Sequence, residues 1–174
     1  MDDVIIRAAE PGDEPFLWEM LALAAHMPGD PEEAGAAARR DPFLAKFVRD
    51  WGRPGDLGAV AVDAGGRGLG AAWLRHLTGP EQSYPAVDPA YPELAVAVRP
   101  ERTGRGLGGA LLGRLLAMAR GVYPGVVLSV RADNPAQRLY ERHGFAVTGT
   151  IVNRVGSASH VMELRLAPAG RAAG

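Results

Sequence analysis

The chain has 174 residues, of which 47% are hydrophobic, and a formal net charge of −1. This length and composition fit one domain with a complete hydrophobic core, and the near-neutral charge argues against a nucleic-acid-binding protein. The lack of cysteine excludes disulfides and thiolate zinc sites, and the lack of a basic apolar leader or a long apolar run predicts a cytoplasmic protein with no membrane partner.

Hydrophobic periodicity and turn residues divide the chain into strands and helices. In chain order we predict a strand at 4–9, a helix at 13–26, a helical segment at 32–50 interrupted at Asp41-Pro42, strands at 57–63, 69–77 and 91–99, a helix at 106–120, a strand at 126–131, a helix at 134–143, and strands at 145–152 and 159–166. This order predicts one mixed α/β domain over residues 1–167, followed by a flexible C-terminal tail at 168–174.

Two helix starts are predicted from single residues. Asp13 is expected to cap the first helix, and Asn134 is expected to cap the helix before Gly144, with Pro135 as its first helical residue. The segment 27–56 is long for a connection between helices, and we expect it to cover the substrate side of the domain.

A glycine loop, Arg102-Thr103-Gly104-Arg105-Gly106-Leu107-Gly108-Gly109, follows the strand at 91–99 and opens the next helix. Glycines let the backbone approach a ligand, and a helix N-terminus presents free N–H groups with a partial positive charge. The loop therefore predicts an anion site suited to a phosphate-bearing ligand.

The same loop has a second interpretation, because Gly104, Gly106 and Gly109 spell the dinucleotide fingerprint G-x-G-x-x-G. That fingerprint normally opens a domain of repeated β–α units, and an acidic residue follows about 20 residues later. Here the loop lies past mid-chain, and the residues at 126–128 are Val, Val and Leu. This context opposes a dinucleotide oxidoreductase, and a Walker loop is excluded because no Gly-Lys-Ser/Thr follows.

The residues around the loop resemble the GNAT superfamily of N-acetyltransferases. The match lies in LAVAVRPE at 94–101, GLGGALL at 106–112 and LSVRADNPAQRLYERHGF at 128–145, with IRAAEPGD at 6–13 similar to the family's opening strand and helix. The resemblance implies a central mixed sheet of about seven strands with flanking helices, splayed between the fourth and fifth strands. It also implies an enzyme that moves acetyl from acetyl-CoA to a primary amine by direct attack in a ternary complex.

The resemblance assigns the cofactor site residue by residue. Val96 and Val98 match positions whose backbone groups pair with the pantetheine arm and the acetyl carbonyl, so the Val96 N–H would stabilise the oxyanion. Asn134 matches a residue that contacts the cofactor arm, although its role could be helix capping alone. The pyrophosphate cradle matches Arg102, Thr103, Gly104, Arg105, Gly106, Leu107, Gly108 and Gly109.

One position departs from the family pattern, which usually has Arg or Gln where this chain has Thr103. We therefore expect the backbone N–H groups from Gly104 to Gly109 to hold the pyrophosphate, with Arg102 or Arg105 assisting from the rim.

Two side chains are candidates for proton transfer. Tyr140 matches the family's tyrosine beside the thioester sulfur, and a phenol of pKa about 10 can protonate a thiolate of pKa about 8.5. Its alternative role is a buried helix aromatic. Glu93 is the only carboxylate within its strand, so we nominate it as the base that accepts the amine's proton, the alternative being a strand-start residue that faces solvent.

Trp73, Arg75 and Tyr84 precede the central strand, and we expect them, with Glu93, to bind the acceptor; core packing is the alternative. The histidines show no ligand spacing, so we predict no metal site. The predicted partner is a small-molecule amine or a peptide, and the family suggests a homodimer. A non-catalytic acyl-CoA-binding regulatory module on the same fold is the alternative to an enzyme.

Overall fold

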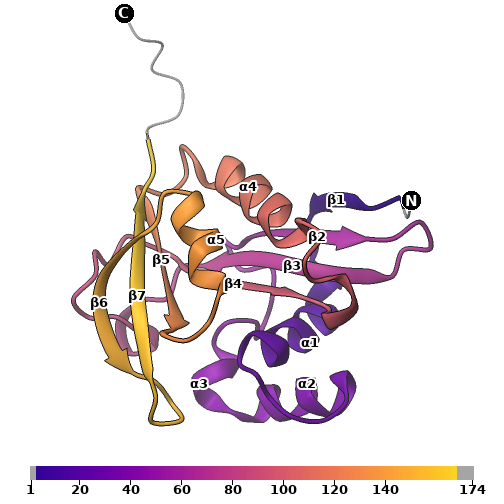
Figure 1. The fold of residues 1–174 in the computed structure, drawn as a ribbon, viewed down its shortest axis with the longest axis horizontal. Coiled ribbons are helices and arrows are strands. Elements are labelled where there is room, and N and C mark those ends of the chain that lie inside the picture. The colour runs from indigo at the N-terminus through magenta and orange to yellow at the C-terminus, as the bar shows by residue number, and fades with distance from the viewer. Residues whose placement is uncertain (1–2, 168–174) are drawn as a thin grey trace, which may run out of the picture.

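Seven strands form one mixed sheet, and helices cover both of its faces (Figure 1). The computed structural model describes residues 3–167, so the predicted tail at 168–174 lies outside the described residues. The strands are β1 (Ile5–Ala8), β2 (Leu57–Val62), β3 (Gly68–Arg75), β4 (Glu93–Val98), β5 (Gly125–Arg131), β6 (Ala146–Val152) and β7 (Ala158–Arg165). The helices are α1 (Glu14–Ala24), α2 (Pro31–Arg40), α3 (Pro42–Ala45), α4 (Leu107–Ala119) and α5 (Ala136–Arg142).

The sheet is splayed between its fourth and fifth strands. Its order is β1-β2-β3-β4-β5-β7-β6, and β4 and β5 run parallel while the other described neighbours are antiparallel. The pairing of β4 with β5 is limited to Glu93 opposite Val127, where the Val127 N–H donates to the Pro92 carbonyl at 3.1 Å. Past this point the two strands diverge (Figure 1). The predicted mixed sheet is thereby confirmed.

Two hydrophobic clusters lie on opposite faces of the sheet. On one face α4 packs on β2 and β3 through its buried leucines, Leu111, Leu112, Leu115 and Leu116. On the other face α1 buries Leu17, Met20 and Leu21 in a cluster that includes Trp73 of β3. The i, i+3 and i+4 spacing read from the sequence produces both apolar faces, and each fully buried leucine contributes about 1.5–3 kcal/mol.

The two predicted helix caps are confirmed in part. Asp13 is the N-cap residue of α1, but its carboxylate makes no hydrogen bond to that helix and instead binds the Arg7 guanidinium through two hydrogen bonds of 2.7 and 2.8 Å. A charged bidentate pair is stronger than a hydrogen bond to a helix N–H. Helix α5 begins at Ala136, so Pro135 occupies the N-cap position, and the Asn134 Oδ1 accepts the Ala136 N–H at 2.9 Å.

The segment 27–56, called the helical cap below, contains α2 and α3 and lies beside α1 (Figure 1). Asp30 caps α2 by accepting the Glu33 N–H at 3.0 Å, and Asp41 caps α3 by accepting the Phe43 N–H at 2.9 Å. The break between the helices therefore falls at Asp41-Pro42, as predicted. In the described part of the chain no helix is long and apolar enough to cross a bilayer.

Candidate active site

A cavity of about 1150 Å³ occupies the gap between β4 and β5. On one side its walls come from β4, β5 and α5, and on the other they come from the end of α1, α3, the loop before β4 and the β6–β7 hairpin. The splay thus connects a space beside α5 with a space under the helical cap. Most of the lining is apolar, and the charged side chains in it are few.

The backbone of β4 offers unpaired groups to this cavity. Arg99 donates its N–H to the Leu69 carbonyl at 2.8 Å. Hydrogen-bonded pairs alternate along antiparallel strands, so Ala97 and Ala95 also form such pairs with β3. By that alternation the N–H and carbonyl of Val96 and Val98 point away from β3, toward β5. Both valines lie past Glu93, the last residue of β4 that pairs with β5. Their backbone groups therefore face the gap, and both residues line it.

The glycine loop forms an open cradle at the start of α4. Gly104 and Gly106 have positive φ angles of 75° and 77°, a conformation that favours glycine, and a Cβ at either would meet no atom within 4 Å. Gly106 is the N-cap of α4 and provides no capping side chain, so the first N–H groups of α4 have no partner from it. This arrangement suits an anion.

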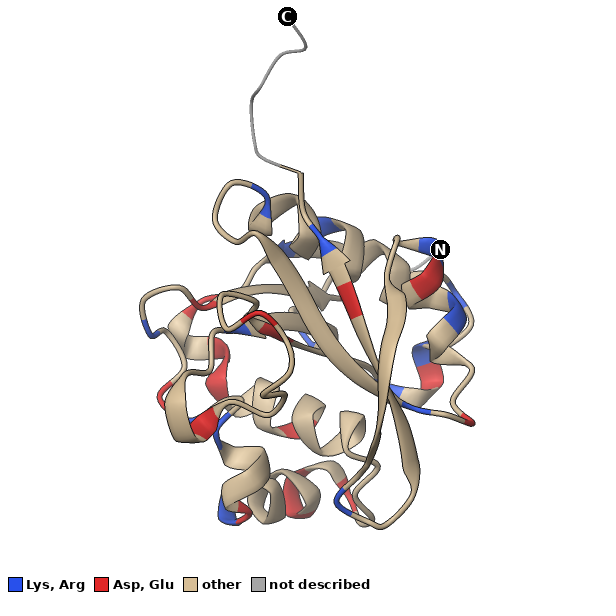
Figure 2. Cartoon of the chain, turned by 90° about the vertical axis from the view of Figure 1, so that its left-hand side faces the viewer, with Lys and Arg blue, Asp and Glu red and all other residues tan. Residues whose placement is uncertain are grey.

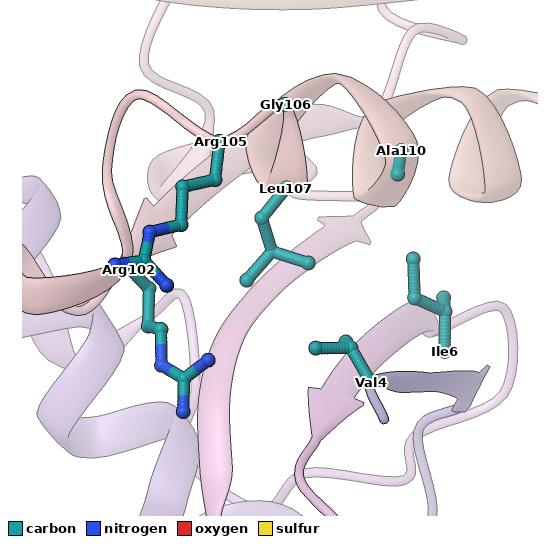
Figure 3. A pocket seen from close by; sticks show the side chains of 7 residues that line it. All are labelled: Val4, Ile6, Arg102, Arg105, Gly106, Leu107 and Ala110. Atoms are coloured by element: carbon teal, nitrogen blue, oxygen red, sulfur yellow. The ribbon is translucent and has the colours of Figure 1, made fainter. Parts of the chain in front are cut away.

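Arg102 and Arg105 lie on the β1 side of the loop. Both line a small hollow of about 230 Å³ between Val4 and Ile6 and the first turn of α4, which also contributes Leu107 (Figure 3). Two guanidinium groups therefore flank the helix N-terminus, where the dipole also favours negative charge.

The remaining loop residues have local roles. Thr103 lines the larger cavity, and its hydroxyl donates to the Pro100 carbonyl at 2.9 Å. Gly108 and Gly109 lie within α4, where a Cβ on either would be 3.5 Å from the Leu139 side chain of α5. A side chain at either position would therefore make ordinary contact with α5.

Tyr140 and Asn134 line the cavity on the same side as Val96 and Val98. Burial raises the pKa of the Tyr140 phenol to about 12, and its ring packs edge-on against Phe145 with centroids 6.0 Å apart. Within residues 3–167 its hydroxyl has no hydrogen-bond partner. The structure thus brings together the predicted acid, the Val96 backbone and Asn134, whose carbonyl oxygen also caps α5.

Glu93 lies just beneath the lining, where β4 and β5 are still paired. The residue is 3% exposed; its Oε2 accepts the Ser83 N–H at 3.0 Å, and its buried Oε1 has no partner among the described residues. Burial raises the pKa of this carboxyl, while the hydrogen bonds from Ser83 and the Lys46 ammonium oppose that rise. Glu93 is therefore not the solvent-facing strand start considered as its alternative.

The three predicted acceptor-binding residues have different surroundings. Tyr84 lines the cavity and donates its hydroxyl to the Ser129 Oγ at 2.8 Å, and burial raises its pKa to about 12. Trp73 and Arg75 are 0% and 1% exposed and are not among the residues that line the cavity, so their surroundings match the alternative of core packing. Side chains of this face of β3 point into the core under the helical cap, where Trp73 donates to the Phe47 carbonyl at 3.0 Å.

Several lining residues were not predicted. The helical cap contributes Phe43 and Phe47, and Lys46 between them donates to the Ser83 Oγ at 2.7 Å and the Glu81 carbonyl at 2.9 Å. Lys46 is the chain's single lysine, which was the one signal that could have drawn attention to it. Across the cavity, the tip of the β6–β7 hairpin reaches the helical cap (Figure 2), where Arg154 binds the Asp41 carboxylate at 2.6 Å.

No group of three or more His, Asp and Glu side chains within residues 3–167 could hold a metal ion.

Comparisons with known proteins agree with this geometry. The acetyltransferase (GNAT) domain family matches residues 59–147. A mycothiol acetyltransferase from Pseudarthrobacter chlorophenolicus is 37% identical over 149 residues, which are 83% of this chain and 43% of that protein. The chain therefore spans less than half the length of this curated relative.

Two solved structures share the fold. A GCN5-related N-acetyltransferase from Kribbella flavida is 26% identical, with a TM-score of 0.65 over 94% of this chain and 98% of that chain. The structure of yncA from Salmonella typhimurium with its cofactor acetyl-CoA is 24% identical, with a TM-score of 0.65 over 99% of this chain and 98% of that chain. The two structures share the fold, and the domain match over half of its residues shows that the chain belongs to the GNAT acetyltransferase family.

Proposed function

We propose that this chain is an acetyl-CoA-dependent N-acetyltransferase that moves an acetyl group to a primary amine by direct attack in a ternary complex. The observation that carries the proposal is the cavity through the β4–β5 splay. Its walls include Val96, Asn134 and Tyr140 on one side and Tyr84 and Phe47 on the other. Two reactants could thus enter from opposite faces of the sheet and meet at the gap, which removes much of the entropic cost of the reaction.

The chain's residues fit a long, anionic cofactor. The open glycine cradle at Gly104 and Gly106, the α4 N-terminus and the flanking Arg102 and Arg105 suit a pyrophosphate. The unpaired backbone of Val96 and Val98 suits an extended chain with amide groups, which could hydrogen-bond as an additional strand would. Acetyl-CoA, when bound, supplies an acetyl group activated as a thioester.

Three groups of the chain would then act on protons and charge. The Val96 N–H would donate a hydrogen bond toward developing negative charge at the gap. Tyr140, with a pKa of about 12, keeps its proton at neutral pH and would be the donor to the departing thiolate. Glu93 would accept the amine's proton through an intervening water, since it lies beneath the lining, and its raised pKa makes it a stronger base than an exposed carboxylate.

The Tyr140→Phe variant tests this proposal. We expect its kcat to fall by about 100-fold or more, because general-acid catalysis typically contributes that much, while acetyl-CoA affinity stays close to that of the native chain. Release of CoA thiol with a panel of amines measures kcat, and calorimetry measures affinity. Tyr91→Phe is the matched control, because Tyr91 does not line the cavity.

Unchanged turnover in Tyr140→Phe would remove Tyr140 from the acid role. Binding of acetyl-CoA without thiol release for any amine would instead favour the non-catalytic acyl-CoA-binding module.

The homodimer and the cytoplasmic location stay predictions. β6 forms a free edge of the sheet and exposes Val147 and Val152 there, which is where a second copy could pair.

A further inference from the structure

We propose that the acceptor is an α-amino acid with an apolar side chain, or a close analogue of one, and that Arg131 binds its carboxylate. The inference rests on the proposed acetyl transfer and names the class of amine that the same cavity takes.

Arg131 is placed on the acceptor side of the splay. Along β5, Val126, Leu128 and Val130 pack into the cluster under α4, so the alternate residues face the opposite side. Ser129 is one of these and accepts the hydrogen bond from Tyr84. Arg131, two residues further on, shares this face and lines the cavity.

The register places Arg131 beside the reaction centre. Glu93 lies opposite Val127 in the parallel pair, and past it Val96 stands three residues along β4 while Arg131 stands four residues along β5. Both residues line the same cavity, so one acceptor can contact the Arg131 side chain and approach the Val96 backbone. An acceptor that reaches both must carry its amine and its anion within a few bonds of each other, as an α-amino acid does.

The charges of the lining favour an anion at this position. The described acidic side chain in the lining is Asp41, and its carboxylate is already bound to Arg154 at 2.6 Å. No described residue makes a hydrogen bond or an ion pair with the Arg131 guanidinium. Arginine at a cavity wall binds a carboxylate through two parallel N–H groups, so this side chain suits an anionic acceptor.

The same lining disfavours two other acceptors. A polyamine carries a second ammonium, which would meet Arg131 instead of a free carboxylate. A peptide N-terminus has no carboxylate on the carbon that bears its amine. Phe43, Phe47 and Leu21 supply an apolar wall for the side chain of an amino acid.

Matched acceptors test the proposal. We would measure kcat/KM for L-leucine and L-phenylalanine, for their amides, for the decarboxylated amines isopentylamine and phenethylamine, and for spermidine. The native chain should prefer each amino acid over its amide and its amine by about tenfold or more, as expected when a buried charged partner is lost. Arg131→Gln should reduce this preference about tenfold, mainly through KM, and Arg131→Lys should reduce it less. Arg138→Gln, an exposed arginine of α5 outside the lining, is the control.

The outcomes separate the inference from the function on which it rests. A native preference for spermidine, for the amides or for the decarboxylated amines would overturn the amino-acid assignment while leaving acetyl transfer intact. Weaker acetyl-CoA binding by Arg131→Gln, with an unchanged preference for amino acids, would assign Arg131 to the cofactor and also overturn it. Absence of thiol release with every amine would overturn acetyl transfer itself. If Arg131→Gln does not fold, the proposal is tested by the preference of the native chain for amino acids and by the change of that preference in Arg131→Lys.

Discussion

Two buried carboxylates near the helical cap, Asp56 and Glu93, have opposite surroundings. Asp56 accepts four hydrogen bonds, from Arg75 at 3.0 and 2.8 Å and from the N–H groups of Gly52 and Arg53 at 3.1 and 3.0 Å. Glu93, the cross-strand neighbour of Arg75, accepts one backbone hydrogen bond on one oxygen and none on the other. Both side chains are buried carboxyl groups, so burial and group type do not distinguish a structural residue from a candidate catalytic one. The two residues differ in how many of their oxygen atoms accept hydrogen bonds.

The largest expected effect is the loss of stability when the Arg75–Asp56 ion pair is broken. Arg75→Ala would leave the Asp56 charge buried and remove the donor to the Lys46 and Arg49 carbonyls. We expect the free energy of unfolding to fall by about 3–5 kcal/mol, the usual cost of breaking a buried ion pair, while the folded variant keeps most of its turnover. Urea denaturation measures the first quantity and initial rates the second. A stable variant with lost activity would reverse the roles assigned to the two carboxylates.

The unsatisfied carboxylate should show the opposite behaviour. Glu93→Gln is expected to lower kcat/KM by about 100-fold, the typical contribution of a general base. The raised pKa of Glu93 means that its ionisation costs stability as pH rises from the unfolded value through the folded one, so the neutral amide should be at least as stable at neutral pH.

The pH profile of Glu93→Gln gives the matching kinetic readout. In the native chain kcat/KM should rise with pH through a midpoint above 4.5, the ordinary value for this carboxyl, and Glu93→Gln should lose that limb. With a pKa of about 12, Tyr140 should cause no fall in activity near neutral pH. A native profile that is flat in the acid range would argue against Glu93 as the base.

The smallest expected effect is a shift in the midpoint of the pH profile when the charge of Lys46 is removed. Its ammonium lowers the pKa of Glu93, so Lys46→Met should move the acid limb of the pH profile to higher pH. Lys46→Arg keeps the charge and should restore the native midpoint. An unchanged midpoint in Lys46→Met would show that the carboxylate does not respond to this cation.

The sequence predicted the elements of the fold better than the partners of individual side chains. Strand and helix order follow from local periodicity. The splay of the sheet, and the places expected for Val96 and Tyr140, came instead from the resemblance to the GNAT family. The surroundings of Arg75 did not, because its partners Lys46, Arg49 and Asp56 lie 19–29 residues away along the chain.

The helical cap shows the same limit. Its helices were predicted from alanine and arginine periodicity and from Asp41-Pro42, which are local signals. The contacts of Lys46 with Ser83 and of Arg154 with Asp41 join segments 37 and 113 residues apart, and no local pattern encodes them. The acceptor side of the cavity is built largely from such contacts, so, apart from Tyr84, its individual residues were not predicted.

The single pair that joins β4 to β5 also divides the sheet into two blocks, β1–β4 and β5–β7. Elsewhere in the sheet a row of backbone hydrogen bonds couples each strand to the next, whereas here Leu128, Phe145 and Met162 of the second block pack in the cluster under α4. A molecule that binds both sides of the gap raises the free energy of unfolding by its own binding term. Because few hydrogen bonds join the two blocks directly, a ligand bound in the gap adds contacts that couple them.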